Sequence, residues 1–365
     1  MHRLRSKRLQ LLVALYFAAF LNHVKSGAIA AEATPLRQRD WKQYPAIADF
    51  PEPAMLYALG DVHGDCDRMV ELLAAARLIS GVPLKPDRIQ WAGGSADLVL
   101  IGDMIDKYTQ SVLVLETLRA LEPQVTKAGG HLVLCVGNHE AEFLASGGDS
   151  KKSAEFGQEL KAIGMSGEDV AARPDAGGLG AWLRNRPVGA RIGDWFFCHA
   201  GNTGGKTLPQ LEAELETDLA DKGYATPFLM DPNSMLEARM HPRPWWTGTS
   251  DPSLHESKKH LATTAVNSRR VPVPPTLKSD VTALGARHLV IAHQPGKIKF
   301  EKGAERKEGE MFERYGGLFF MIDTGMSRGV AGGRGALLQI HTTAAHVVAA
   351  AVYGDGKTVI LWQDP

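Results

Sequence analysis

Three short runs of apolar residues in the first half of the chain are each followed by a segment with helical spacing. Each run ends in a glycine, and together they span Met55–Gly60, Leu98–Gly102 and His131–Gly137. Apolar residues then recur every three or four positions over residues 69–78, 111–121 and 141–144. Three successive β-then-α units predict a sheet covered by helices, and strands that are apolar throughout predict burial on both faces.

The second half of the chain has a different pattern. Residues 147–186 are polar, rich in glycine and weakly helical, which indicates a cap inserted after the third unit. Strands at 188–192 and 195–198 are predicted to form a hairpin, and residues 208–220 a polar helix. Apolar runs with little helical pattern between them then follow at residues 288–292, 318–322, 336–340, 347–352 and 358–362. These late runs predict the strands of a second sheet.

The first 30 residues have the pattern of a secretory signal peptide. Basic residues within Met1–Arg8 precede an apolar run, Leu9–Leu21, and small residues at 28–30 predict cleavage before Ala31. An uncleaved membrane anchor is the alternative, although this apolar run is short for a membrane span. We therefore expect a periplasmic or secreted protein with no stable membrane partner after cleavage. Residues 31–54 would form a leader segment, and residues 55–365 a single domain.

Composition and charge exclude several classes of protein. The chain has 41 basic and 41 acidic residues and is 44% hydrophobic, which is typical of a globular protein and excludes a disordered chain, a collagen-like repeat and a coiled coil. Without its first 30 residues the chain would carry 36 basic and 41 acidic side chains, so we expect no nucleic-acid partner. Three cysteines do not make a disulfide framework, and we expect them to be small buried residues.

Polar residues gather at the points where the predicted strands end. Five such segments are Gly60–Asp65, Gly102–Lys107, Gly137–Glu140, Cys198–Gly201 and Ile291–Pro295. In an α/β sheet, ligands bind beyond the carboxyl ends of the strands. Five strands that each carry Asp, Asn or His to this edge therefore predict a single site.

The residue types at these strand ends favour a site for two metal ions. Asp61 and His63 are two residues apart, so an extended backbone would point both to the same side. Asp103 can bridge two ions, and three further side chains can complete the second ion's ligands: Asn138, His199 and His293. Carboxylate and imidazole together are typical of Fe, Zn, Mn or Co sites rather than Ca sites.

In their order along the chain, the five segments resemble the signature motifs of the calcineurin-like metallophosphoesterases and, within them, of the phosphoprotein phosphatase branch. The resemblance runs from about Tyr57 to Ala336. Two further segments, Trp91–Gly94 and Ile322–Ser327, are similar to those of the bacterial and Shewanella-like subgroup. The resemblance implies an α/β fold with four layers, α/β/β/α, in which two mixed sheets stack between outer helices.

The resemblance also implies a role for each site residue. The first metal would be held by Asp61, His63 and Asp103, and the second by Asp103, Asn138, His199 and His293. The cofactors would be two divalent or trivalent ions (Mn, Fe or Zn), and a hydroxide bridging them would attack phosphorus. His139 would protonate the leaving oxygen as the general acid, and Asp106 would orient its ring.

The expected phosphate-binding residues depart from the family pattern. Where the family has an arginine after Asp106, this chain has Lys107, which keeps the charge but loses the bidentate geometry of a guanidinium. Arg239 and Arg243 lie in the interval where the family's second phosphate-binding arginine is found. We interpret the set of metal ligands as complete and the phosphate contacts as altered.

The predicted function is the hydrolysis of phosphomonoesters, with either a phosphoprotein or a small phosphate ester as substrate. Similar motifs occur in dinucleoside-polyphosphate hydrolases, and a longer phosphate chain would be consistent with Lys107. A metal-binding module that has lost turnover is a third hypothesis, although His139 and Asp106 are intact.

Other polar residues near the site are given structural interpretations. Asp65 is as well placed to cap the helix that follows it as to support a metal ligand, and Glu140 is expected to start its own helix. The basic residues within 297–307 are expected to form a solvated face.

Overall fold

The computed structural model describes residues 39–172, 178–240, 244–247, 273–300 and 303–364. The predicted signal peptide and residues 31–38 of the predicted leader lie outside these ranges, as does Arg243. Within the described ranges, no helix has both the length and the apolar character needed to cross a membrane.

Most of the described strands form two six-stranded mixed sheets. The first sheet has the order β14-β13-β12-β2-β3-β4, with strands at Thr358–Gln363, Val347–Tyr353, Ala336–Thr342, Met55–Leu59, Asp97–Ile101 and Leu132–Cys135. The second has the order β1-β5-β6-β7-β11-β10, with strands at Ile47–Phe50, Gly189–Ile192, Trp195–Cys198, His288–Ile291, Phe319–Met321 and Phe312–Arg314. A separate pair is formed by β8 (Ile298–Lys299) and β9 (Glu305–Arg306).

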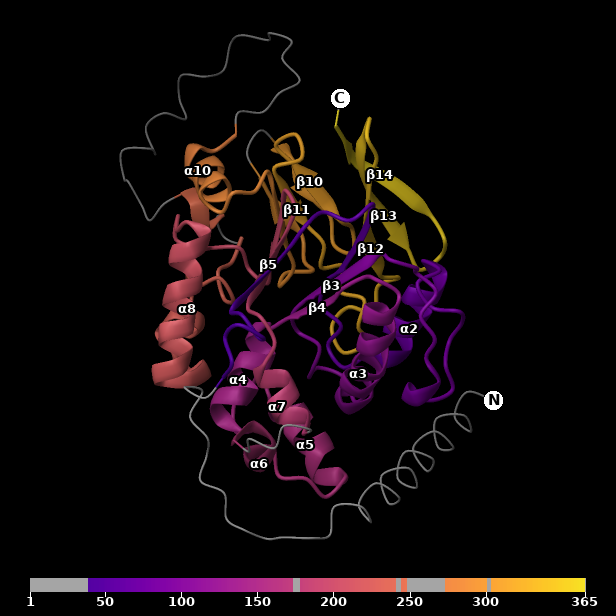
Figure 1. The fold of residues 1–365 in the computed structure, drawn as a ribbon, viewed down its shortest axis with the longest axis vertical. Coiled ribbons are helices and arrows are strands. Elements are labelled where there is room, and N and C mark those ends of the chain that lie inside the picture. The colour runs from indigo at the N-terminus through magenta and orange to yellow at the C-terminus, as the bar shows by residue number, and fades with distance from the viewer. Residues whose placement is uncertain (1–38, 173–177, 241–243, 248–272, 301–302, 365) are drawn as a thin grey trace.

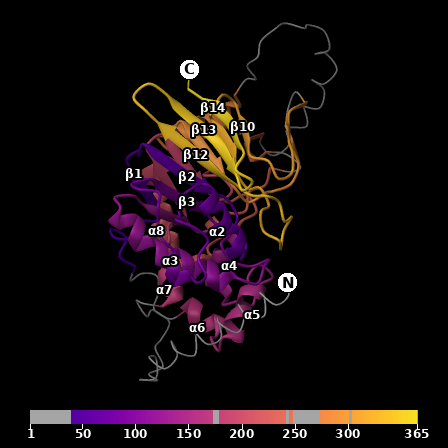
Figure 2. The ribbon, with the colours of Figure 1, turned by 90° about the vertical axis from the view of Figure 1, so that its right-hand side faces the viewer.

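Helices lie outside the two sheets. On one side are α2 (Cys66–Ala75) and α3 (Ser111–Lys127), and on the other are α8 (Leu208–Lys222) and α10 (Pro275–Ala283) (Figure 1). Four helices gather at the end of the molecule away from β12–β14, namely α4 (Asn138–Ser146), α5 (Ala154–Ala162), α6 (Gly167–Ala172) and α7 (Leu179–Arg184) (Figure 2). The shorter elements are α9 (Pro227–Met230) and the 3-10 turns η2 (Pro86–Arg88), η3 (Gly223–Ala225) and η4 (Trp245–Thr247).

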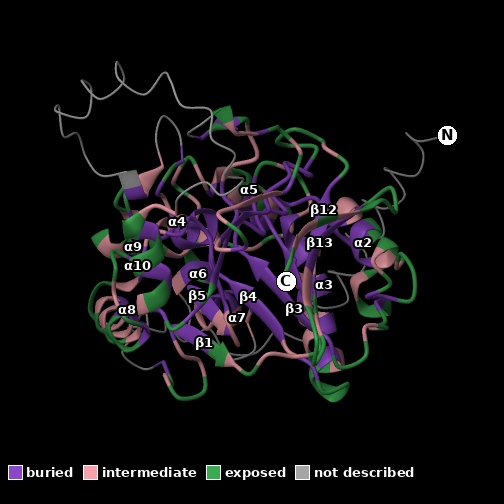
Figure 3. Ribbon diagram, turned by 90° about the horizontal axis from the view of Figure 1, so that it is seen from above, coloured by how far each residue is buried: buried purple, intermediate pink, exposed green. Residues whose placement is uncertain are grey.

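Three apolar cores separate four layers. Val99 of β3 packs with Phe197 and Val290 in the core between the sheets, whereas its neighbour Leu100 belongs to the core beneath α2 and α3. A third core joins the second sheet to α8 and includes Leu289. Alternate residues of a strand point to opposite faces, so apolar strands supply two cores at once. Figure 3 shows the buried strands at the centre and exposed residues on outer helices such as α8. The predicted four-layer fold is confirmed.

The late strands do not form a sheet of their own. β12 pairs antiparallel with β2, and β13 and β14 continue the first sheet from it. Of the five predicted late strands, only β7 and β11 join the second sheet, where they pair in parallel with each other. The second sheet is therefore confirmed, but assigning β12–β14 to it was wrong. An apolar run identifies a strand, whereas its partner depends on contacts between distant parts of the chain.

The predicted leader contains part of the fold. β1 pairs in parallel with β5 at the edge of the second sheet, and its Ile47 and Ala48 are buried. Arg39 is also buried and donates a hydrogen bond of 2.7 Å to the carbonyl of Arg184. The domain therefore begins before the predicted boundary at Met55. A four-residue edge strand is too short to show a period in the sequence.

Other predicted elements are found where the sequence places them. The hairpin that turns at Gly193-Asp194 is β5–β6, and the polar helix is α8. Residues 147–186, which the sequence predicts to be an inserted cap, include the three short helices α5, α6 and α7. All three cysteines are free and buried, as expected.

Candidate metal centre and active site

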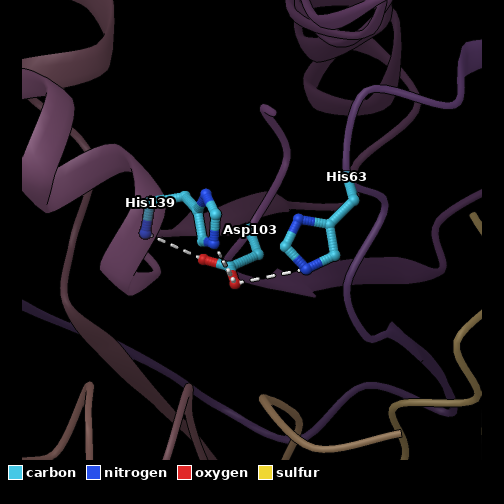
Figure 4. Close-up of side chains that lie close together, drawn as sticks. All are labelled: His63, Asp103 and His139. Carbon is cyan, nitrogen blue, oxygen red and sulfur yellow. Dashed lines mark hydrogen bonds and ion pairs between the residues drawn. The ribbon is translucent and has the colours of Figure 1, made fainter. Parts of the chain in front are cut away.

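Asp103 lies at the centre of the predicted site. Its Oδ2 is 3.5 Å from His63 Nε2, 3.4 Å from His199 Nε2 and 4.0 Å from His139 Nε2. Figure 4 shows His63 and His139 on either side of this carboxylate. The three histidines follow β2, β4 and β6, and Asp103 follows β3. Strands of both sheets therefore carry side chains to the same edge, as the sequence predicts.

The remaining predicted ligands surround this centre. Asp61 Oδ2 is 3.7 Å from His63 Nε2, and Asp61 Oδ1 accepts a 3.2 Å hydrogen bond from the main-chain N–H of His293. Asn138 Oδ1 is 3.1 Å from His199 Nε2. All six predicted ligands are buried: Asp61, His63, Asp103, Asn138, His199 and His293.

Two overlapping groups of side chains could each hold a metal ion. One group is His63, Asp103 and His139, the other is Asp103, His199 and His293, and the ligand atoms within each lie within 4.8 Å of one another. His293 Nε2 is buried and has no hydrogen-bond partner among the described residues. Buried polar atoms without partners are rare, so this orphaned nitrogen fits a metal ligand. Imidazole and carboxylate donors fit transition-metal ions.

The main chain is strained at the site. Among the described residues, seven non-glycine residues have positive φ angles, and five of them follow site strands: His63, Asp103, Asp106, Lys107 and His293. Each such conformation costs about 1–3 kcal/mol and persists where the surrounding structure imposes it. The strand ends therefore hold these side chains in place at a cost in stability.

Gly102 shows how closely the loops approach one another. Its φ is +100°, and a Cβ at this position would lie 2.5 Å from the Cα of Gly137 and 2.7 Å from His199 Nδ1. A side chain would therefore clash with two loops that carry predicted ligands. The glycine next to Asp103 is thus required by both its conformation and its neighbours.

Glu140 organises two of the loops. Its carboxylate accepts main-chain hydrogen bonds from Gly137, Asp103, Met104 and Ile105, at 2.8 to 3.1 Å. Burial, followed by the charge of Asp103, raises its pKa to about 7. The sequence indicated only that this residue starts a helix. Its wider role depends on main-chain groups 35 to 37 positions away, which no local pattern reveals.

His139 and Asp106 are paired as predicted. His139 Nδ1 is 3.3 Å from Asp106 Oδ2, and Asp106 Oδ1 accepts a 2.7 Å hydrogen bond from the main-chain N–H of Phe156. Burial alone would lower the pKa of His139, but the charges of Asp103 and Asp106 outweigh it and raise the pKa above its ordinary value. These two carboxylates therefore favour the protonated form of the ring.

Asp323 is a site residue that the sequence analysis did not assign. It is buried, its Oδ2 has no hydrogen-bond partner among the described residues, and its charge acts on Asp61. Burial, followed by the charges of Asp323 and Asp103, raises the pKa of Asp61 well above its usual range. The signal was present, because Asp323 follows a predicted strand in the same way as the predicted ligands do.

A buried arginine supports Asp323. Arg306 donates hydrogen bonds to the carbonyl oxygens of Asp323, Gln294 and Gly296, and thus ties the loop after His293 to the loop after β11. Its side chain is fully buried. The expectation of a solvated face over residues 297–307 is therefore wrong for this residue.

The structure describes two of the three predicted phosphate-binding residues. Lys107 and Arg239 are exposed, and the positive charge of Arg239 acts on His293. Arg243 lies outside the described residues.

Asp65 accepts a hydrogen bond from the N–H of Arg68 and thereby caps α2, and it also forms an ion pair with Arg328. The capping interpretation of Asp65 is confirmed.

Two stacked sheets with buried histidines and aspartates at their shared edge define an α/β protein whose side chains could hold metal ions. The chain belongs to the calcineurin-like phosphoesterase family, whose model matches residues 55–260. Hydrolysis of phosphoesters is the chemistry that this family membership implies.

Two curated relatives and one solved structure illustrate the range of similar proteins. Shewanella-like protein phosphatase 2 of Arabidopsis thaliana is 31% identical over 134 residues, 37% of this chain and 32% of that protein. A symmetrical bis(5'-nucleosyl)-tetraphosphatase of Paraburkholderia phymatum is 27% identical over 165 residues, 45% of this chain and 46% of that protein. A cold-active protein tyrosine phosphatase has a TM-score of 0.59 and 18% identity, covering 87% of this chain and 82% of its own.

These similarities differ in what they establish. The chain spans less than half the length of both curated relatives, so their activities are not transferred by the match alone. The solved structure shares the fold at low sequence identity. Family and fold are thus established, and the substrate is a matter for proposal.

Proposed function

We propose that the protein is a metal-dependent phosphatase that hydrolyses phosphomonoesters, either on phosphoprotein or on a small phosphate ester. The observation that carries this proposal is the position of Asp103, which belongs to both groups of potential metal ligands and lies 4.0 Å from the ring of His139. This arrangement supports the use of two ions, of Mn, Fe or Zn, beside a general acid.

We assign separate roles to the side chains that would hold metal ions and to those that would donate a proton. Asp61, His63 and Asp103 would hold one ion, and Asp103, Asn138, His199 and His293 the other. Ions held there would supply an activated water and neutralise charge on the phosphoryl group. Asp106 keeps Nδ1 of His139 occupied, so Nε2 is the nitrogen that faces Asp103 and can give a proton to the leaving oxygen. The raised pKa of His139 favours the protonated ring that this role needs.

The first test is turnover of p-nitrophenyl phosphate by purified protein loaded with Mn²⁺. We expect hydrolysis by the wild type, and we expect Asp103→Asn and His139→Asn to abolish it, because one change removes the shared ligand and the other removes the acid. His346→Asn, at an exposed histidine outside the site, is the control and should retain activity. Full activity in Asp103→Asn would refute the assignment.

A second candidate function is hydrolysis of dinucleoside polyphosphates. It is favoured by the similarity to symmetrical bis(5'-nucleosyl)-tetraphosphatases and by Lys107 in place of the family arginine. Initial rates on diadenosine tetraphosphate, a phosphotyrosine peptide and a phosphoserine peptide distinguish the two. A preference of more than tenfold for diadenosine tetraphosphate would replace the first proposal by the second.

We also propose that the protein is exported and acts in the periplasm or outside the cell. The proposal rests on the basic, apolar and small-residue segments of residues 1–30. Amino-terminal sequencing of the protein recovered from the cell that makes it should begin at Ala31. A mature protein that retains Met1 would contradict export by cleavage.

A further inference from the structure

A lysine of the inserted segment lies beside the metal centre. Lys152, just before α5, has its ammonium group in contact with Glu237 Oε1, and the same group is 3.4 Å from Glu142 Oε1 on α4. Glu237 Oε1 also accepts a 3.1 Å hydrogen bond from Asn138 Nδ2. One carboxylate oxygen therefore joins Lys152 directly to a predicted metal ligand.

Two carboxylates hold the side chain of Lys152 at the edge of the site. The side chain of Lys152 is 29% exposed, so it is neither locked in the core nor free in solvent. Lysine carries three donors on a flexible stem and can exchange one anionic partner for another.

A phosphate group near Asn138 would be repelled by a neighbouring carboxylate. Glu237 places a negative charge next to Asn138, and a phosphomonoester is itself a dianion near neutral pH. Like charges at short range repel, so a cation facing Glu237 would favour substrate binding in addition to the proposed metal ions. Lys107 follows β3 and is exposed, whereas Lys152 already contacts the repelling carboxylate.

We propose that Lys152 is a substrate-binding residue that moves from Glu237 to the phosphate of the bound substrate. In the substrate-free state, Glu237 holds the ammonium group at the rim of the site. When phosphate binds, the ammonium group becomes its hydrogen-bond donor, and Glu237 remains bonded to Asn138. The inserted segment would then supply part of the phosphate recognition that the family arginine provides elsewhere. This inference rests on the proposed phosphatase function.

The experiment compares Lys152→Ala with Lys151→Ala, a matched change at the neighbouring exposed lysine. Lys152→Ala should raise both KM for p-nitrophenyl phosphate and Ki for inorganic phosphate by roughly ten- to a hundredfold, as expected for a lost hydrogen bond to a charged group. The kcat should change less, and Lys152→Arg should restore most of the affinity. Lys151→Ala should match the wild type. Unchanged KM and Ki in Lys152→Ala would overturn the proposal.

A double variant separates direct binding from mere neutralisation of Glu237. Glu237→Gln keeps an acceptor for Asn138 but removes the negative charge. If Lys152 only neutralises Glu237, Lys152→Ala combined with Glu237→Gln should bind phosphate as tightly as Glu237→Gln alone, which would overturn the proposal. If Lys152 contacts phosphate, the double variant should stay at least fivefold weaker than Glu237→Gln.

A binding measurement tests the role of Lys152 independently of whether the protein is an active phosphatase. Calorimetric titration of inorganic phosphate into the Mn²⁺-loaded full chain reports affinity whether or not the protein turns over p-nitrophenyl phosphate. An inactive wild type would refute the phosphatase proposal, and the titrations would still decide the role of Lys152. Weaker phosphate binding by Lys152→Ala supports that role, and equal binding refutes it.

Discussion

The pKa of Asp103 and the pKa of His139 are shifted in opposite directions by the charges of the site. Burial by itself raises the pKa of its carboxyl group, but the neighbouring His199 and His139 hold it well below its usual range. The same negative charge helps to raise the pKa of His139. The same set of charges therefore favours the ionised form of Asp103, a proposed ligand, and the protonated form of His139, the proposed acid.

Replacement of Asp106 by asparagine should narrow the pH range of activity. As the proposed general acid, His139 must carry a proton to act, so activity should be present below its pKa and be lost as pH rises through it. Asp106 is one of the groups that raise this pKa, so its removal should move the basic limb of the kcat/KM profile to lower pH. We also expect kcat to fall by roughly ten- to a hundredfold, because the ring loses its orienting partner.

The measurement is the pH–rate profile of the Mn²⁺-loaded wild type and variant. Asp87→Asn, a change at an exposed aspartate in η2, is the control and should leave the profile unchanged. A basic limb that stays in place in Asp106→Asn would assign that limb to a group other than His139.

Residues of the site differ in how far their roles could be predicted. The metal-ligand candidates were predicted because each follows an apolar strand, and the edge of a sheet brings such positions together. Glu140 and Lys152 gave no comparable signal, because their partners lie on other elements. Asp323 also follows a predicted strand, so the same rule would have placed it among the candidate site residues.

At the scale of elements, α5 supports the candidate site from within the predicted insertion, residues 147–186. The main-chain N–H of Phe156 donates to Asp106, and Glu159 accepts hydrogen bonds from the main-chain N–H groups of Ser111 and Val112 at the start of α3. The first turn of a helix has N–H groups without partners, so Glu159 caps α3 from another helix. The insertion therefore helps to position the carboxylate that orients His139.

Glu159→Ala should weaken both the fold and the activity. The loss of a helix cap costs typically about 1 kcal/mol, so we expect the free energy of unfolding in urea to fall by roughly 1–2 kcal/mol. The kcat should also fall while the bound metal content stays constant, because Asp106 is displaced but the predicted ligands are not. Glu71→Ala, at an exposed position of α2, is the control. Wild-type stability in Glu159→Ala would show that α5 does not support α3.

The pairing of elements was harder to predict than their existence. Strand positions follow from apolar runs, yet β12 pairs with β2, and the bonded side chains of Gln339 and Tyr57 are 282 residues apart in the chain. Parallel and antiparallel partners cannot be chosen from a strand's own sequence. The edge strand β1 went unrecognised because its four residues show no period.

At the scale of the whole molecule, the site joins the two sheets. His63 and Asp103 follow strands of the first sheet, and His199 and His293 follow strands of the second. Metal ions held between them would link the two sheets across the edge of their shared core. Binding to the folded state alone stabilises that state.

Metal removal should therefore lower the melting temperature. A ligand present at a thousand times its Kd adds about 4 kcal/mol to the stability of the folded state. We expect treatment with EDTA to lower Tm by several degrees and Mn²⁺ to restore it, as measured by scanning calorimetry. Asp103→Asn, which removes the shared ligand, should show a much smaller response to Mn²⁺. Equal responses in both proteins would place the stabilising ions elsewhere.

The reactivity of the three buried thiols should report how often the folded protein opens. Burial raises the pKa of Cys66 to about 12 and that of Cys198 to about 12, and it raises the pKa of Cys135 as well. Only thiolates that reach solvent react with alkylating reagents. The folded protein should consequently resist iodoacetamide, whichever redox conditions surround it. Each modified cysteine then marks a transient opening that exposed that part of the interior to solvent.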